Sequence, residues 1–243
     1  MTDERLRQPE VISEALATEI ATAFDAFWAA EVPLNYHLEN ADEATKQRYL
    51  DGEMRFVEQV LETTLNLAAS NNGPVTVLFD LDETIALNKD YDATPRHLVR
   101  PSFPVLAEEL KRRLGSDVDI GILTGRGQSH LNEEMANPQV LTDILSAVNP
   151  DMVHSVREDG ILASAIAEVT SSEASQYDTL DWQCVERYDV YTVRKALMLH
   201  KLTEMYPDRA FVCVDDHQWV TRLNPDNPRV RGVHATGETM FFV

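Results

Sequence analysis

The first part of the chain carries two stripes of apolar residues with helical spacing. The first stripe consists of residues four positions apart: Ile12, Leu16, Ile20, Phe24 and Trp28. The second stripe runs through residues 50–68 and stops before the helix-breaking sequence Asn-Asn-Gly-Pro at 71–74. Side chains at this period share one face of a helix, so two amphipathic helices are predicted.

Each of these two helices needs a surface that buries its apolar face. Neither has a strongly basic polar face, which argues against binding to a membrane surface. We therefore interpret residues 1–73 as a helical extension that packs on a core domain formed by residues 74–243. Two further placements stay open: the helices could border the functional site as a lid, or form a homodimer interface.

After Pro74 the pattern changes to short apolar runs that alternate with helical segments. Five runs are rich in β-branched or other apolar residues: 75–79, 118–123, 152–156, 210–214 and 230–234. Continuous apolar runs of this length are typical of strands that are buried on both faces of a parallel sheet. The pattern predicts an α/β fold with a parallel sheet of about five strands.

The segments between the predicted strands also follow helical patterns. Ser102 is predicted to cap a helix that ends at Gly115, and residues 141–148 form another helical pattern. Residues 170–179 are polar and lack an apolar period. They indicate a small insert at about 157–190.

Composition narrows the functional classes. With 41 acidic and 21 basic residues the formal net charge is −20, which argues against a polyanion such as duplex nucleic acid as the main ligand. Two distant cysteines support neither a disulfide framework nor a structural zinc site. The amino terminus lacks an apolar leader, and no run approaches the ~18 apolar residues that span a bilayer. We expect a cytoplasmic protein without a membrane partner.

The most specific chemical signal is the sequence FDLDETIA, in which Asp80 and Asp82 follow the first predicted strand. Ligands of open α/β sheets bind at the carboxyl ends of the strands. If the chain curls after Asp80, one carboxylate can attack phosphorus. The other can then protonate the leaving oxygen and activate water.

Three later features of the sequence are expected to lie near the same edge of the predicted sheet. The second strand leads into Thr124 and Gly125, which offer a hydroxyl and an unhindered backbone N–H to a phosphate oxygen. The fourth strand ends in the adjacent acids Asp215 and Asp216, which are costly unless solvated or bound to a cation. Lys195 opens the helical segment before that strand and can offset negative charge.

These motifs, in this order, resemble the haloacid dehalogenase (HAD) superfamily over residues 74–236: DLDET, LTGR, a lysine opening a KALxL helix, and a strand ending in DD. The resemblance implies a Rossmann-like core and an aspartyl-phosphate intermediate on Asp80, with Asp82 as general acid and base. It also implies Mg²⁺ bound by Asp80, the Asp82 carbonyl, and Asp215 or Asp216.

The resemblance also implies that Thr124 and Lys195 hold the phosphate, and Thr84 matches the family's helper at the end of the first motif. Gly125 and Arg126 are further substrate-binding candidates, because they directly follow Thr124. For Arg126 a helix-capping or salt-bridging role is the alternative, and Lys201 is the rival of Lys195. Asp215 is the slightly favoured direct metal ligand. The histidines show no paired spacing that would indicate zinc.

The substrate is less well defined by the sequence. The segment between Asp80 and Thr124 already holds a helix and leaves no room for a full helical cap, so a small or absent cap is expected. The resulting prediction is a Mg²⁺-dependent phosphomonoester hydrolase acting on a small phosphorylated metabolite. Alternatives are a phosphatase or phosphotransferase acting on a protein or nucleic-acid end, and a HAD-fold binding or regulatory protein with little turnover.

Overall fold

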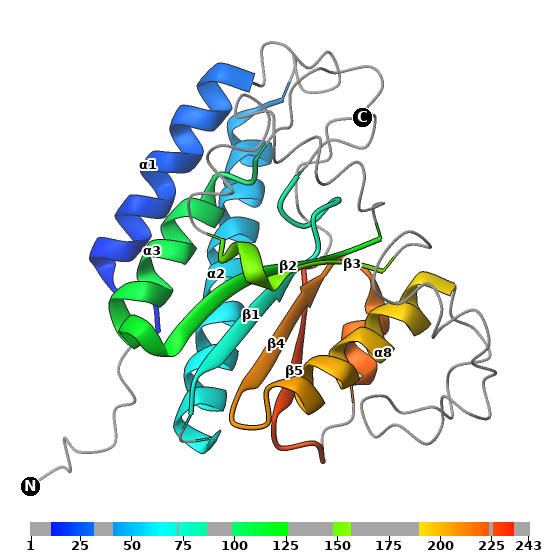
Figure 1. Ribbon diagram of the computed structural model, residues 1–243. Coiled ribbons are helices and arrows are strands. Elements are labelled where there is room, and N and C mark those ends of the chain that lie inside the picture. The colour runs from blue at the N-terminus through cyan, green and yellow to red at the C-terminus, as the bar shows by residue number, and fades with distance from the viewer. Residues whose placement is uncertain are drawn as a thin grey trace, which may run out of the picture.

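The structure is a computed structural model, shown in Figure 1. It describes the following residues: 11–31, 41–71, 73–86, 99–125, 148–156, 190–223 and 226–235. The predicted helix at 141–148, Arg126 and the predicted insert at 157–190 lie largely or wholly outside these ranges.

The described strands form one parallel sheet of five strands in the order β3-β2-β1-β4-β5. The strands are β1 (Val75–Phe79), β2 (Val118–Thr124), β3 (Val153–Ser155), β4 (Ala210–Asp215) and β5 (Val230–His234). The α/β class and the parallel five-stranded sheet are thus confirmed, and all-parallel sheets of this kind occur in Rossmann-like folds. Every residue of β1 and β4 is buried, which explains why these segments show continuous apolar runs rather than alternation.

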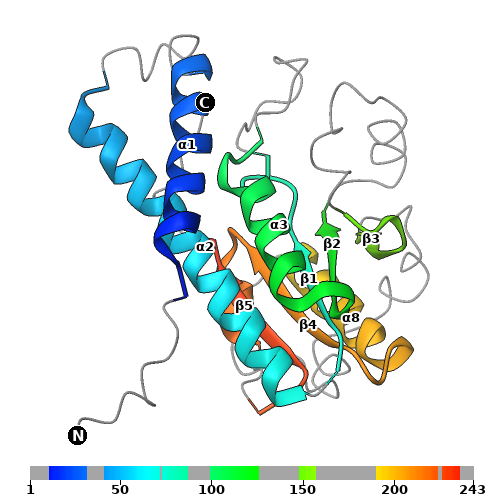
Figure 2. The same ribbon diagram turned by 90° about the vertical axis from the view of Figure 1, so that its left-hand side faces the viewer.

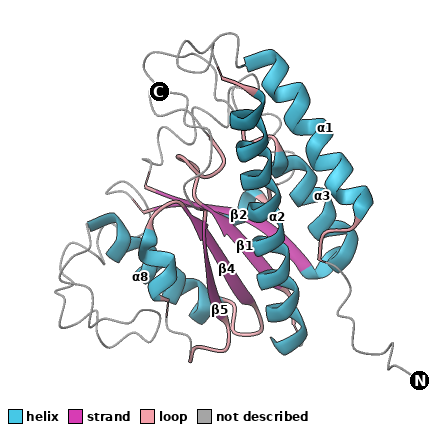
Figure 3. Ribbon diagram, turned by 180° about the vertical axis from the view of Figure 1, so that it is seen from behind, coloured by secondary structure: helices cyan, strands magenta, loops and turns pink. Residues whose placement is uncertain are grey.

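Helices cover both faces of the sheet, as Figures 1 and 3 show. The four described α-helices are α1 (Glu14–Glu31), α2 (Glu43–Asn71), α3 (Ser102–Leu114) and α8 (Val190–Met205). Three short 3-10 helices accompany them: η3 (Gly115–Asp117), η4 (Pro150–Met152) and η6 (Gln218–Arg222).

The sheet separates two hydrophobic clusters, because successive side chains of a strand point to opposite faces. Val75, Val77 and Phe79 of β1 pack in one cluster with residues of α2 and α3. Leu78 packs in the other cluster with α8 and with Trp219 of η6. This division produces a three-layer arrangement in which α2 and α3 form one outer layer and α8 the other (Figure 1).

Helix α2 contacts the sheet directly, at β1, β4 and β5. Helix α1 packs on α2 and α3 (Figure 2) and lies further from the sheet (Figure 1). Both helices begin with side-chain caps: Ser13 Oγ accepts from Leu16 N at 3.2 Å, and Asp42 Oδ1 accepts from Thr45 N at 2.8 Å. Helix α3 differs from the prediction, because no side chain caps it and Ser102 instead turns its hydroxyl to Glu53 of α2.

The strand order creates a switch point between β1 and β4. The chain leaves β1 toward β2 on one side, and it leaves β4 toward β5 on the other side. Crevices at the carboxyl ends of such strand pairs are the usual ligand sites of open α/β sheets. Asp80 follows β1, and Asp215 is the last residue of β4.

Among the described helices, none is both long and apolar enough to cross a membrane.

Candidate active site

The segment after β1 curls into a tight turn over residues 80–86. Asp80 continues the strand pairing through its amide, which donates to the Val214 carbonyl at 2.8 Å. The amides of Ile85 and Ala86 then donate back to the Leu81 carbonyl at 3.1 and 2.8 Å. Glu83 takes a left-handed backbone conformation, with φ of 59°, which non-glycine residues adopt at a cost. The turn therefore places Asp80 and Asp82 at the carboxyl edge of the sheet.

Asp215 is the most heavily hydrogen-bonded carboxylate described at this edge. Its Oδ2 accepts from Lys195 Nζ at 2.6 Å and from Trp219 Nε1 at 2.8 Å, and its Oδ1 accepts from His217 N at 2.8 Å. Three donors from α8, η6 and the segment after β4 thus fix one side chain. Such satisfaction is needed, because Asp215 is only 2% exposed and an unpaired buried carboxylate is expensive.

Lys195 reaches the site from α8, which lies on the face of the sheet opposite to α2. Its Nζ lies 3.0 Å from Asp80 Oδ1 and 2.6 Å from Asp215 Oδ2. The side chain is buried, so its charge acts with little screening by water. Lys195 therefore links the ends of the two strands at the switch point.

The nucleophile candidate has an incompletely satisfied oxygen. Within the described part of the chain, Asp80 Oδ1 is buried and accepts no hydrogen bond of normal geometry, although Lys195 Nζ lies within ion-pair distance. The pKa of Asp80 is raised to about 8, mainly by burial and further by the negative charges of Asp215 and Asp82, against the opposing charge of Lys195. The ionised carboxylate thus lacks charge compensation that a bound cation would supply.

Two further pKa shifts have related causes. The pKa of Asp216 is raised to about 7, mainly by burial and also by the nearby carboxylates of Asp215 and Glu83. Burial alone would lower the pKa of Lys195, but the carboxylates of Asp80 and Asp215 outweigh it, so the pKa is raised. Lys195 is therefore a permanent cation, while the acids around it repel one another.

Asp80, Asp215 and Asp216 form a candidate metal centre. One carboxylate oxygen from each residue lies within 4.8 Å of the other two. Carboxylate oxygens are the preferred protein ligands of Mg²⁺. The incompletely satisfied Asp80 oxygen provides a second reason that the residues fit a hard divalent cation.

The other residues predicted for the site are placed as follows. Thr84 is fully buried, and its hydroxyl accepts from Asp216 N at 3.0 Å, so it connects the turn after β1 to the acidic pair. Thr124 is the buried last residue of β2, next to β1 in the sheet, and Gly125 follows it. Asp82 is partly buried, and its backbone forms an isolated β-bridge with Ala86 within the turn.

Several neighbours of the site were not found by sequence reasoning. Trp219 and His234 support the acidic pair, the latter through Nε2, which lies 2.7 Å from the Asp216 carbonyl. Glu53 and Arg100 form a buried ion pair beneath the Thr84 turn. Of these residues, only Glu53 could have been noticed in the sequence. It lies four positions before Val57, on the apolar stripe of α2, where a charged residue is unusual unless it is paired.

Comparison of the chain with protein-family models, with curated proteins and with solved structures gives no match.

Proposed function

We propose that this chain is a Mg²⁺-dependent phosphomonoester hydrolase of the HAD type, acting on a small phosphorylated metabolite through an aspartyl-phosphate intermediate on Asp80. The observation that carries the proposal is the Asp80 carboxylate, which is buried at the switch point within ion-pair distance of Lys195 and beside Asp215 and Asp216. A strand-end carboxylate with perturbed pKa and a buried cation at its side is typical of a catalytic centre.

The acidic residues would hold the metal ion. Because three donors already satisfy Asp215, we assign the direct side-chain contacts to Asp80 and Asp216, and the Asp82 carbonyl is the further ligand that the family resemblance implies. This assignment differs from the slight sequence-based preference for Asp215, whose carboxylate belongs to the same cluster. When bound, Mg²⁺ would neutralise charge on the carboxylates and on the phosphoryl oxygens.

The reaction would take place in two displacements. In the first, an Asp80 carboxylate oxygen attacks phosphorus, the P–O bond to the leaving group breaks, and the Asp82 carboxyl gives its proton to the departing oxygen. In the second, the Asp82 carboxylate takes a proton from water as the water oxygen attacks phosphorus. The bond between phosphorus and Asp80 then breaks, which releases inorganic phosphate and restores both side chains.

The remaining polar groups would bind the phosphoryl group. Lys195 is already held by Asp80 and Asp215, so its ammonium is oriented before substrate arrives. We assign the Thr124 hydroxyl and the Gly125 amide to phosphoryl oxygens, with Arg126 following in sequence as a further contact. Thr84 would act on the site through its hydrogen bond to Asp216.

A hydrolysis assay with p-nitrophenyl phosphate tests the proposal. We expect release of p-nitrophenolate with Mg²⁺, loss of this activity in excess chelator, and recovery when Mg²⁺ is restored. Full activity in chelator would refute the metal role. A folded chain that binds Mg²⁺ but hydrolyses neither this ester nor any member of a phosphorylated-metabolite panel would favour a binding or regulatory protein instead.

A further inference from the structure

A buried ion pair joins helix α2 to the turn that carries the proposed nucleophile. Arg100 Nη1 lies 2.9 Å from Glu53 Oε1, and the two side chains are 0% and 3% exposed. The Ser102 amide donates to Glu53 Oε2 at 3.3 Å, and the Ser102 hydroxyl donates to the same oxygen. The Arg100 guanidinium also lies over the Phe56 ring, 4.1 Å from its centroid.

Arg100 also contacts the turn at residues 80–86. Its Nε donates to the Thr84 carbonyl at 2.6 Å, and its amide donates to the Ile85 carbonyl at 2.8 Å. The Thr84 hydroxyl in turn accepts from Asp216 N at 3.0 Å. A continuous series of contacts therefore runs from Glu53 through Arg100 and Thr84 to Asp216, which directly follows β4.

Stability alone gives a weak reason for this arrangement. Removing two charges from water costs several kcal/mol per ion, and well-packed apolar residues of similar volume often replace a buried ion pair without loss. The planar guanidinium instead offers donors in fixed directions, which suits it to holding two acceptors in a defined relation. Here the acceptors are a helix α2 carboxylate and the carbonyl of Thr84.

We propose that Glu53 and Arg100 are positioning residues for the metal centre: they fix the Thr84 turn, and through it Asp216, so that helix α2 forms part of the functional apparatus. The inference rests on the proposed function, since it concerns the same metal centre. Outer contacts of metal ligands typically change metal affinity by about 10- to 100-fold when they are removed.

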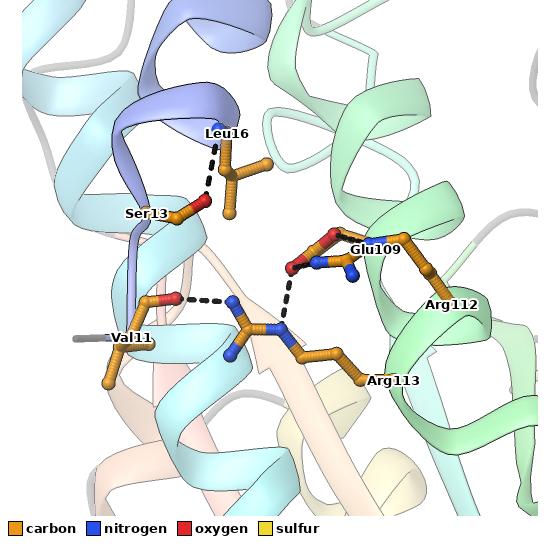
Figure 4. A network of polar contacts seen from close by, with 6 residues as sticks. All are labelled: Val11, Ser13, Leu16, Glu109, Arg112 and Arg113. Atoms are coloured by element: carbon orange, nitrogen blue, oxygen red, sulfur yellow. Dashed lines mark hydrogen bonds and ion pairs between the residues drawn. The ribbon is translucent and has the colours of Figure 1, made fainter. Parts of the chain in front are cut away.

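Mg²⁺ affinity, measured by calorimetric titration of the full-length chain without substrate, separates positioning from a purely structural role. Glu53→Gln keeps the shape of the side chain but removes its charge. Glu109→Gln is the matched control. Glu109 is also buried, at 5% exposed, and pairs with Arg112 and Arg113 at the end of α3 that leads to the amino end of β2 (Figure 4).

Both substitutions are expected to lower the melting temperature. Glu53→Gln is expected to weaken Mg²⁺ binding roughly 10- to 100-fold, with a matching rise in the Mg²⁺ concentration needed for half-maximal hydrolysis. Glu109→Gln is expected to leave both values within about twofold of wild type, because its contacts lie outside the series that reaches Asp216. Equal Mg²⁺ affinity in wild type and Glu53→Gln would overturn the inference.

A second variant covers the case in which Glu53→Gln does not fold. Ser102→Ala removes one donor to Glu53 and retains both charges, so a several-fold loss of Mg²⁺ affinity is expected, and an unchanged affinity would overturn the inference. Failure of the proposed function looks different. A wild-type chain that neither binds Mg²⁺ nor hydrolyses phosphate esters refutes both ideas, whereas an active wild type with unaffected variants refutes the positioning role alone.

Discussion

The two edges of the sheet differ in how their charged side chains are paired. At the amino edge, Arg209 precedes β4 and pairs with Asp119 of β2, while its Nη1 also donates to Thr76 Oγ1 of β1 at 2.8 Å. Asn149 adds a hydrogen bond to the other oxygen of Asp119, at 3.2 Å. At the carboxyl edge, Asp80, Asp215 and Asp216 gather around Lys195, and the pKa values of Asp80 and Asp216 are raised.

This difference indicates what each edge contributes. The amino edge matches an acid to a base and so holds three strands together. The carboxyl edge concentrates acids beyond the number that its buried lysine can compensate, which costs stability in the metal-free chain. Proteins retain such costly arrangements mainly at functional sites.

Replacing one aspartate at each edge by asparagine is expected to give the largest difference between the two edges. Asp80→Asn should reduce kcat/KM by about 10⁴-fold or more, because the amide is nearly isosteric but is not a competent nucleophile. It should maintain or raise the melting temperature of the metal-free chain, since a buried negative charge is removed. Hydrolysis rates and thermal unfolding in chelator measure both effects.

Asp119→Asn should behave in the reverse manner. Its loss of an ion pair is expected to cost about 1 kcal/mol, or roughly 2–4 °C in melting temperature, with kcat/KM unchanged. Loss of a general acid or base alone can still leave about a hundredth of the wild-type activity. If Asp80→Asn retains more activity than this, Asp80 is not the nucleophile.

The second test removes the cation of the carboxyl edge. Lys195→Met leaves Asp80 and Asp215 without their ion-pair partner, so the free energy of unfolding in chelator should fall by about 3–5 kcal/mol. Lys201→Met, on the same helix, is the control and should stay within about 0.5 kcal/mol of wild type. Denaturant unfolding of both variants provides the measurement. An equal loss in the two variants would mean that Lys195 has no special electrostatic role.

The smallest expected effect concerns the contribution of Glu109 to folding stability and how it depends on pH. Like Asp119, Glu109 is a carboxylate paired with arginine. Burial raises its pKa, but hydrogen bonds from Arg112 and Arg113 outweigh burial, and the pKa is lowered from its ordinary value of 4.5. A lowered folded-state pKa stabilises the fold above the unfolded pKa, and this contribution disappears as pH falls through the folded value.

The stabilisation by Glu109, about 1 kcal/mol or less, should therefore be constant from neutral pH to about pH 5.5 and vanish in stronger acid. The melting temperatures of wild type and Glu109→Gln, compared across this range, measure it. A difference that persists unchanged at the acidic end would show that the loss comes from packing rather than from charge.

The sequence predicted the sheet well because its signals are local. Continuous apolar runs follow from burial on both faces, and Gly115 ends α3 with φ of 59°, a conformation that favours glycine. Strand ends also identify which polar residues share an edge. Asp80 and the Asp215–Asp216 pair were selected in this way, and Lys195 was selected from the helical segment before the fourth strand. These residues, far apart in the chain, lie together in the structure.

Residues that act across the layers could not be found by the same means. Arg100 lies outside any periodic segment, and its partners Glu53 and Thr84 are 47 and 16 positions away. Ser102 matched a helix cap locally, but a buried carboxylate on α2 captures its hydroxyl instead. Such contacts depend on how α2 packs on the sheet, which apolar periodicity does not specify.

The most direct test of the central claim is a search for phosphate on Asp80. In Asp82→Asn the base that activates water is missing, yet p-nitrophenolate leaves without protonation, so the covalent intermediate should accumulate. We expect a burst of about one p-nitrophenolate per chain. Acid quench and borohydride reduction should then convert Asp80 to homoserine, detected by peptide mass. Slow steady release of p-nitrophenolate with no burst and an unmodified Asp80 peptide would contradict the account.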